Sequence, residues 1–308
     1  MSIAYCPLFN ISIDNDVLND FNEFIINTNL KILTKDYKLT SSKLVQSNLS
    51  FKEQEELPYY WLYVKANCDF YTITNYIHLF QLSLLIVKST TLKIFYKFNT
   101  EDLNRFEDIF KFIDEKEYNV NIELDDTVLI KKYYPIILEI FNENNRLRSA
   151  LVSMLNGCTA IHWSASYVLF ITTFETILTH KSNWGIKKKL AWAYSILTEK
   201  DNQQREIAFR EFLKIYKVRS EILHGESFKD KYNDGKLNLK ELAKCRDMLR
   251  KLWQIILNSE ELIDVLSGKD NVRKEYFKKI SEGWMPKDLS SPLEGEKTRI
   301  ISSQRGSE

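Results

Sequence analysis

The second half of the chain repeats apolar residues at helical spacing, and this pattern constrains the fold more than any other feature. From about residue 126 onward, apolar positions recur three or four residues apart in five successive segments, which is typical of helices that bury one face. The segments span residues 126–156, 162–180, 186–197, 205–224 and 236–268. We expect Pro135 to mark a kink or boundary, residues 199–204 to form a loop, and Gly225 to end the fourth helix. Only 8 glycines and 5 prolines are present, which also favours long helices.

The first part of the chain has a mixed pattern. Short runs rich in aromatic and β-branched residues predict strands at residues 4–13, 30–34, 59–66 and 90–98. Residues 16–28 predict a short helix capped by Asp14 or Asn15, and the helical spacing of Tyr76, Phe80 and Leu84 predicts another. Residues 100–115 predict a third helix, because Thr100 is a suitable N-cap and acidic residues follow it.

These patterns predict a mainly α fold with three parts. Residues 1–125 form a smaller mixed α/β N-terminal module, sensory or regulatory in role. Residues 126–285 form a bundle of four to five helices, and residues 286–308 form a polar tail that we expect to be disordered.

The composition excludes several classes of protein. With 44% hydrophobic and 28% charged residues and a net charge of +1, the chain is typical of a globular protein, without a global field for nucleic acid or membrane. The four cysteines are far apart, so we expect neither a zinc site nor a disulfide framework. The start lacks the pattern of a secretory signal, and the most apolar run, residues 76–87, is too short for a membrane span. We therefore expect a cytoplasmic protein that does not bind membranes.

Polar side chains interrupt the apolar face of the segment that ends at His224. Phe209, Phe212 and Tyr216 lie on that face, and the next turns hold Arg219, Ser220 and His224. Ser220 and His224 share one side of a helix, whereas Arg219 and His224 are about 140° apart around its axis. A histidine that changes charge beside a permanent cation suits phosphate chemistry, in which one group moves protons and the other stabilises negative charge. The alternative is structural: Arg219 forms an interhelical salt bridge and His224 caps the helix.

The segment from residue 208 to 226, with the two helical segments before it, resembles the Apea-like branch of the HEPN superfamily. The signature of that family is R-x(4–6)-H near the end of a long helix, typically with a tyrosine before it, a serine directly after the arginine and a glycine directly after the histidine. It is matched here by five positions: Tyr216, Arg219, Ser220, His224 and Gly225. The resemblance covers roughly residues 145–260, weakens back to about residue 70 and is absent before that.

The resemblance implies a metal-independent endoribonuclease that needs no cofactor. Two copies would pair through the HEPN domain so that both motifs face one cleft. His224 would act as acid or base while the 2′-hydroxyl attacks the neighbouring phosphate and leaves a 2′,3′-cyclic end. Arg219 would stabilise the charge on the phosphate, and Ser220 would hydrogen-bond the phosphate or His224.

Further residues have supporting roles in this reading. Glu175 lies on the flank of the apolar face of its segment, and we expect it to orient Arg219 by a charge-assisted bond or to form a plain ion pair with it. Tyr216 lies one turn before Arg219, and Glu221 lies between Arg219 and His224. Both are also predicted to support the motif. Four lysines are candidates for binding RNA: Lys187, Lys188, Lys189 and Lys217. For the first three, which form one run, a solvated helix face is the favoured explanation.

The sequence therefore predicts a dimeric HEPN ribonuclease with RNA as its substrate, acting in bacterial antiviral defence or in a toxin system. A regulatory protein or a phage trigger would be a further partner, acting through the N-terminal module; this step is analogy. The alternative is a non-catalytic HEPN module that binds RNA or a protein partner. A third interpretation is a helical protein in which the motif is coincidental, and a His224 buried in the core of the monomer would favour it.

Overall fold

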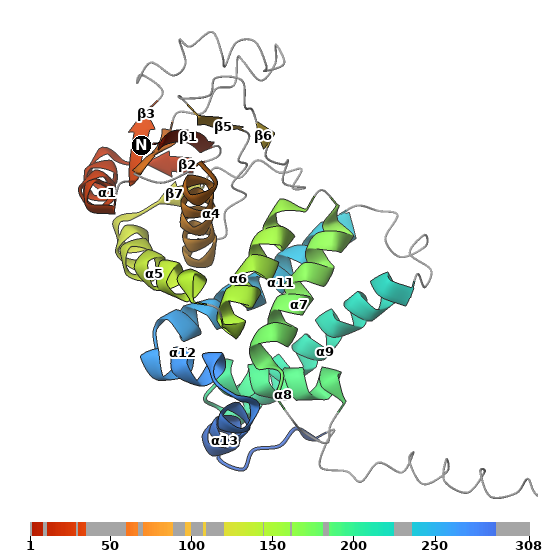
Figure 1. Cartoon of the computed structure of the whole chain (residues 1–308). Coiled ribbons are helices and arrows are strands. Elements are labelled where there is room, and N and C mark those ends of the chain that lie inside the picture. The colour runs from red at the N-terminus through yellow and green to blue at the C-terminus, as the bar shows by residue number, and fades with distance from the viewer. Residues whose placement is uncertain are drawn as a thin grey trace, which may run out of the picture.

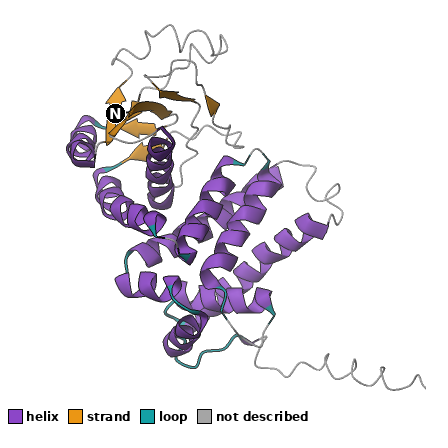
Figure 2. Cartoon of the chain, viewed as in Figure 1, coloured by secondary structure: helices purple, strands orange, loops and turns teal. Residues whose placement is uncertain are grey.

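The N-terminal part of the protein contains all the strands that the structure describes. The structure is a computed structural model that describes residues 2–8, 11–28, 30–34, 60–66, 70–88, 96–99, 107–108, 120–143, 145–160, 162–180, 185–224 and 236–287. Helices dominate these residues, so the fold is mainly α, as the sequence predicts. Figure 2 shows the strands gathered at one end of the molecule and helices elsewhere.

A five-stranded sheet has the order β3-β4-β1-β5-β6, and two further strands, β2 and β7, pair in parallel. Strand β1 is central and pairs antiparallel with β4 from Ser2↔Ala66 to Leu8↔Tyr60. The bounds of the strands are β1 Ser2–Leu8, β2 Ile11–Ile13, β3 Leu30–Thr34, β4 Tyr60–Ala66, β5 Tyr96–Asn99, β6 Glu107–Asp108 and β7 Val120–Ile122. The predicted strands at 30–34 and 59–66 are confirmed to within a residue at their ends, whereas the run at 4–13 contains two strands, β1 and β2, that belong to different sheets. Of the run at 90–98 the structure describes only Tyr96–Phe98, which lies in β5.

The prediction of a helix over residues 100–115 is wrong at the two positions that the structure describes. Glu107 and Asp108 form β6, which pairs antiparallel with β5 in the register Lys97↔Glu107. The spacing and cap signals are local, and pairing with a neighbouring strand overrides them. The other residues of this prediction, Thr100 included, lie outside the described residues.

Two helices belong to the N-terminal part: α1, Asn15–Thr28, and α4, Phe70–Val87. Nearly every described side chain in the second half of α4 is buried, including the polar Gln81 and Ser83. A helix that is apolar on all sides lies in a core or a membrane; α4 packs against α5, α11 and the sheet. None of the helices in the described part of the chain is long and apolar enough to cross a membrane.

The rest of the described chain is helical from residue 124 (Figure 1). The helices are α5 Leu124–Asn142, α6 Arg146–Thr159, α7 Trp163–Leu178, α8 Ile186–Thr198, α9 Asn202–His224, α11 Lys236–Leu257, α12 Glu260–Ser267 and α13 Asp270–Ile280. This region therefore has more helices than the four to five that the sequence predicts. Its core is continuous with that of the N-terminal part, since Ile13 and Val17 belong to the same cluster of buried side chains as Phe277.

Three predicted helix boundaries are wrong. Helix α5 continues through Pro135, so a boundary there is wrong, while a kink there stays a prediction. The chain breaks instead before α6, where the side chain of Asn145 accepts a hydrogen bond from the N–H of Arg148. The predicted helix over residues 236–268 is two helices, because Ser259 caps α12 by accepting from the N–H of Leu262 at 3.2 Å. Helix α9 begins at Asn202, since the carboxylate of Asp201 accepts hydrogen bonds from the backbone N–H groups of Gln203 and Gln204. Gly225 and residues 288–308 of the tail lie outside the described residues.

Helix α11 ties the N-terminal part to the helical region. Arg250 donates to the carbonyl oxygens of Leu85 at 2.7 Å and Val87 at 2.8 Å, and the amide of Gln254 donates to Ile86 at 2.7 Å. These three carbonyls at the C-terminal end of α4 have no partner within their own helix. Two side chains of α11 thus satisfy the open end of α4.

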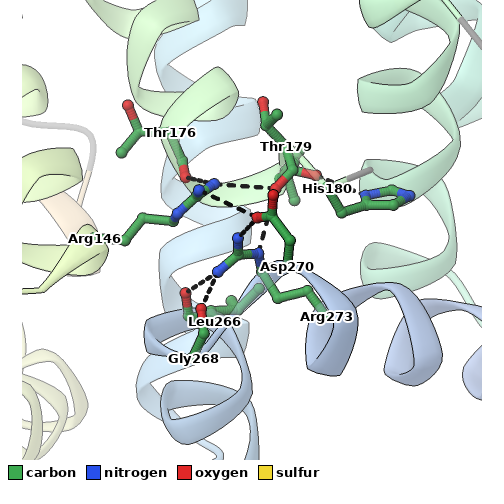
Figure 3. A network of polar contacts seen from close by, with 9 residues as sticks. Arg146, Thr176, Thr179, His180, Leu266, Gly268, Asp270 and Arg273 are labelled. Atoms are coloured by element: carbon green, nitrogen blue, oxygen red, sulfur yellow. Dashed lines mark hydrogen bonds and ion pairs between the residues drawn. The ribbon is translucent and has the colours of Figure 1, made fainter. Parts of the chain in front are cut away.

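A second set of arginines closes the C-terminal end of α7 (Figure 3). Arg146 donates to the carbonyl oxygens of Thr176 at 3.1 Å and Thr179 at 3.0 Å, and Arg273 donates to Thr179 at 3.3 Å. Arg273 is almost fully buried and also binds Asp270 and the carbonyl oxygens at the end of α12. These contacts fix the last turn of α7, which carries Glu175.

Candidate active site

Helix α9 carries the predicted motif along the edge of its buried face. Phe209, Phe212 and Ile215 are fully buried, and Arg219 follows Ile215 by one turn on the same side of the helix. The structure therefore places Arg219 in core register, as expected. Its side chain nevertheless keeps 26% of its surface exposed, so the guanidinium is accessible from solvent.

Glu175 reaches Arg219 from α7. The Oε1 atom of Glu175 lies 3.4 Å from Nη2 of Arg219. Both side chains are partly buried, with 19% of Glu175 and 26% of Arg219 exposed. The contact that the sequence predicts between these two residues is thus present. Its role in catalysis remains a prediction.

Tyr216 completes a group of three side chains. Its hydroxyl donates to Oε1 of Glu175 at 2.8 Å, and its ring lies 5.5 Å from the guanidinium carbon of Arg219. Burial and the neighbouring carboxylate raise the pKa of Tyr216 to about 12. The hydroxyl therefore stays protonated and acts as a donor at neutral pH.

The guanidinium of Arg219 is not fully satisfied by these neighbours. Its Nε atom is buried and has no hydrogen-bond partner among the described residues. Its contacts with the described residues are the ion pair with Glu175 and the ring of Tyr216. An arginine held in this way still presents donors to an anion.

The rest of the motif lies on the last turn of α9. His224 is the final residue of the helix and is exposed; among the described residues it makes no hydrogen bond or ion pair. Ser220 is partly buried, and Glu221 lies 3.6 Å from Lys217 as an ion pair along the helix. The structure brings Glu175, Tyr216 and Arg219 together, and it shows no contact of His224 with them. A His224 buried in the core, which would have favoured a coincidental motif, is not found.

The four candidate lysines occupy two places. Lys187, Lys188 and Lys189 are partly buried in the first turns of α8, and Lys217 is exposed on α9 beside Glu221. The charge of Lys217 is thus offset by a neighbour on its own helix, as on an ordinary solvated face. The described contacts do not connect either set to Arg219.

Sequence reasoning missed Tyr167, which positions the helix carrying the motif. Tyr167 on α7 is fully buried, and its hydroxyl donates to the carbonyl oxygen of Ile215 at 2.9 Å. In a helix that carbonyl is also the acceptor for the N–H of Arg219. The sequence contains a signal, since a tyrosine on an apolar face needs a partner for its hydroxyl, but the partner cannot be read from it.

Among the described residues, no group of three or more His, Cys, Asp and Glu side chains is arranged to hold a metal ion. Cys158 and Cys245 are buried and unpaired by disulfides, and burial raises the pKa of both thiols, so they are uncharged. The candidate site therefore consists of arginine, glutamate, tyrosine and histidine side chains. Comparison of the chain with models of protein families, with curated proteins and with solved structures finds no match.

Proposed function

We propose that the protein is an endoribonuclease of the HEPN type, with Arg219 and His224 as its catalytic residues. The observation that carries the proposal is that Arg219, held by Glu175 at 3.4 Å, keeps 26% of its side chain exposed. The resemblance led to the predicted contact between these two residues. A purely structural salt bridge would give the same contact, but it does not require an accessible guanidinium. The exposed His224 at the end of the same helix supports the proposal further.

The proposed reaction needs no metal ion. The 2′-hydroxyl of the RNA gives its proton to His224 while its oxygen attacks the adjacent phosphorus. The bond from phosphorus to the 5′-oxygen breaks, and the imidazolium of His224 gives the proton to that oxygen. The products carry a 2′,3′-cyclic phosphate and a 5′-hydroxyl. Arg219 stabilises the negative charge that grows on the phosphate oxygens.

The proposed active form is a homodimer formed through the HEPN domain, in which two copies of the motif line one cleft. The exposure of His224 and of Leu223, which is 52% exposed, supports a partner at this end of α9. We place the protein in antiviral defence or a toxin system, with the N-terminal part responding to a regulatory protein or a phage trigger.

The test is to incubate the purified protein with total RNA in the presence of EDTA and to sequence the new ends. The proposal expects fragments that carry 2′,3′-cyclic phosphate. Matched variants are Arg219→Ala and Arg210→Ala, because Arg210 is an exposed arginine on the same helix. Loss of cleavage in the first and retention in the second support the proposal. RNA that stays intact favours the non-catalytic module that binds RNA or a protein partner, whereas equal cleavage by both variants overturns the catalytic role of Arg219.

A further inference from the structure

One carboxylate oxygen in the candidate site has two competing donors. Oε1 of Glu175 accepts from the hydroxyl of Tyr216 at 2.8 Å and lies 3.4 Å from Nη2 of Arg219. The first distance is that of a good hydrogen bond, whereas charge-assisted bonds between arginine and carboxylate are usually near 2.8 Å. The neutral tyrosine thus holds the carboxylate closer than the charged arginine does.

The arginine has a donor that this carboxylate would satisfy. Nε of Arg219 is buried without a partner among the described residues, and arginine and carboxylate commonly pair through two parallel hydrogen bonds. A small movement of Glu175 toward Arg219 would give Nε a partner and shorten the contact to Nη2. Leaving a buried donor unpaired is unfavourable, so a further interaction must oppose this movement.

On α9 itself, Arg210 shows the ordinary arrangement. Its Nε donates to Oε1 of Glu206 at 3.0 Å in a single bond, and the other oxygen of Glu206 accepts from the backbone N–H of Lys287 at 3.2 Å, so no tyrosine hydroxyl competes for the bonded oxygen among the contacts that the structure describes. The two arginines differ in what else binds their carboxylate. At Arg219 the competing group is the hydroxyl of Tyr216.

We propose that Tyr216 is a positioning residue that prevents Glu175 from forming a complete two-bond pair with Arg219. This inference rests on the proposed function, in which Arg219 binds a phosphodiester of RNA. A carboxylate that pairs fully with the guanidinium would offset its charge and occupy its donors. Held by Tyr216, Glu175 orients Arg219 from one side and leaves it able to bind a phosphate oxygen. The ring of Tyr216, 5.5 Å from the guanidinium carbon, supports the charged group as well.

The test removes the hydroxyl and keeps the ring. Tyr216→Phe is expected to lower kcat for RNA cleavage about tenfold with KM changed less than about twofold, because a transition-state contact is weakened. Glu175→Gln in the same chain removes the competing charge, so the double variant should recover to within about threefold of Glu175→Gln alone. Tyr216→Phe at the wild-type rate overturns the inference, and so does a double variant whose loss is the product of the single losses, which a merely structural role predicts.

A second readout does not depend on cleavage. In protein labelled with nitrogen-15, the Nε–H resonance of Arg219 should move downfield in Tyr216→Phe, because Nε gains a hydrogen bond to Glu175, while that of Arg210 stays in place. If neither form cleaves RNA but the resonance moves, the proposed function is wrong and the positioning role stands. If wild type cleaves RNA and Tyr216→Phe changes neither rate nor resonance, the positioning role is wrong and the proposed function stands.

Discussion

The hydroxyl of Tyr167 on α7 donates a 2.9 Å hydrogen bond to the carbonyl oxygen of Ile215 on α9. The contacts of Glu175 on α7 with Tyr216 and Arg219 on α9 connect the same two helices. Helix α7 therefore fixes both the backbone of that turn and the side chain of Arg219.

We expect Tyr167→Phe to lower the free energy of unfolding by about 1 kcal/mol, the usual net value of one hydrogen bond. The ring remains, and the carbonyl of Ile215 keeps its partner within the helix, so no acceptor is left unsatisfied. Urea denaturation followed by circular dichroism measures the change. A loss of less than about 0.3 kcal/mol would show that the bond does not hold the helices together.

Gly157 in α6 lies where a side chain does not fit. A Cβ at this position would be 2.7 Å from the ring atoms of Phe170 on α7. Alanine is a better helix former than glycine by about 1 kcal/mol, but overpacking a core typically costs about 1–3 kcal/mol. We therefore expect Gly157→Ala to lower the free energy of unfolding.

The control for that change is Gly185→Ala, because a Cβ there meets nothing within 4 Å. Its expected effect on the free energy of unfolding is smaller, a loss of about 0.5 kcal/mol, because alanine is less favourable than glycine at the N-cap of α8. Thermal unfolding compares the two variants. If Gly157→Ala is as stable as Gly185→Ala, Phe170 moves aside readily and the close approach of α6 and α7 is not required.

Arg250 provides a test of the connection between the N-terminal part and the helical region. Arg250→Met leaves the carbonyl oxygens of Leu85 and Val87 without this donor, and we expect a loss of about 2–4 kcal/mol. The neighbouring Lys251→Met removes a surface ion pair with Glu199 and should cost about 0.5 kcal/mol. Denaturant titration of both variants measures this difference. Equal losses would contradict the role of Arg250 at the end of α4.

His180 predicts a dependence of stability on pH. Burial against Trp192 and Phe277 lowers the pKa of His180 from 6.5, and the charges of Lys189 and Arg273 lower it further, opposed by the carbonyl of Leu178 and by Asp270. The unfolded chain then binds a proton more readily than the folded one. The stability from the neutral imidazole is complete above pH 6.5 and is lost as the pH falls from there through the folded-state pKa.

The measurement is the free energy of unfolding between pH 7.5 and pH 5 in wild type and in His180→Phe. The variant should lose less stability over this range than wild type. His162, exposed at the start of α7, serves as the control through His162→Asn, which keeps a capping side chain. Identical pH slopes in wild type and His180→Phe would exclude His180 as the titrating group.

Local patterns in the sequence predicted much of the fold. The buried stripe of α9 and the cap residues around α1 and α7 depend on residues near one another in the chain, and these elements are placed within a few residues. The break between α11 and α12 also had a local signal in Ser259, but the apolar spacing continues across it and concealed the cap.

Contacts between distant residues were harder to predict. Pairing of Glu107 with Lys97 turned a helical pattern into a strand, and the arginine contacts at the ends of α4 and α7 have no periodicity that reveals them. In the candidate site, the pair of Glu175 and Arg219 was predicted only because of the family resemblance. The hydrogen bond of Tyr216 to the same carboxylate depends on the crossing of α7 and α9, which no spacing along the chain specifies.

The most direct test of the proposed function is the initial rate of RNA cleavage in EDTA by wild type, His224→Ala and Lys214→Ala in parallel. Both replaced residues are exposed on α9, so neither change should affect folding, and Lys214 belongs neither to the motif nor to the surface proposed for the partner. We expect a fall of about 100-fold or more in His224→Ala, the usual size for loss of a group that transfers protons, and a much smaller change in Lys214→Ala. Cleavage by His224→Ala at the wild-type rate would contradict the proposed function.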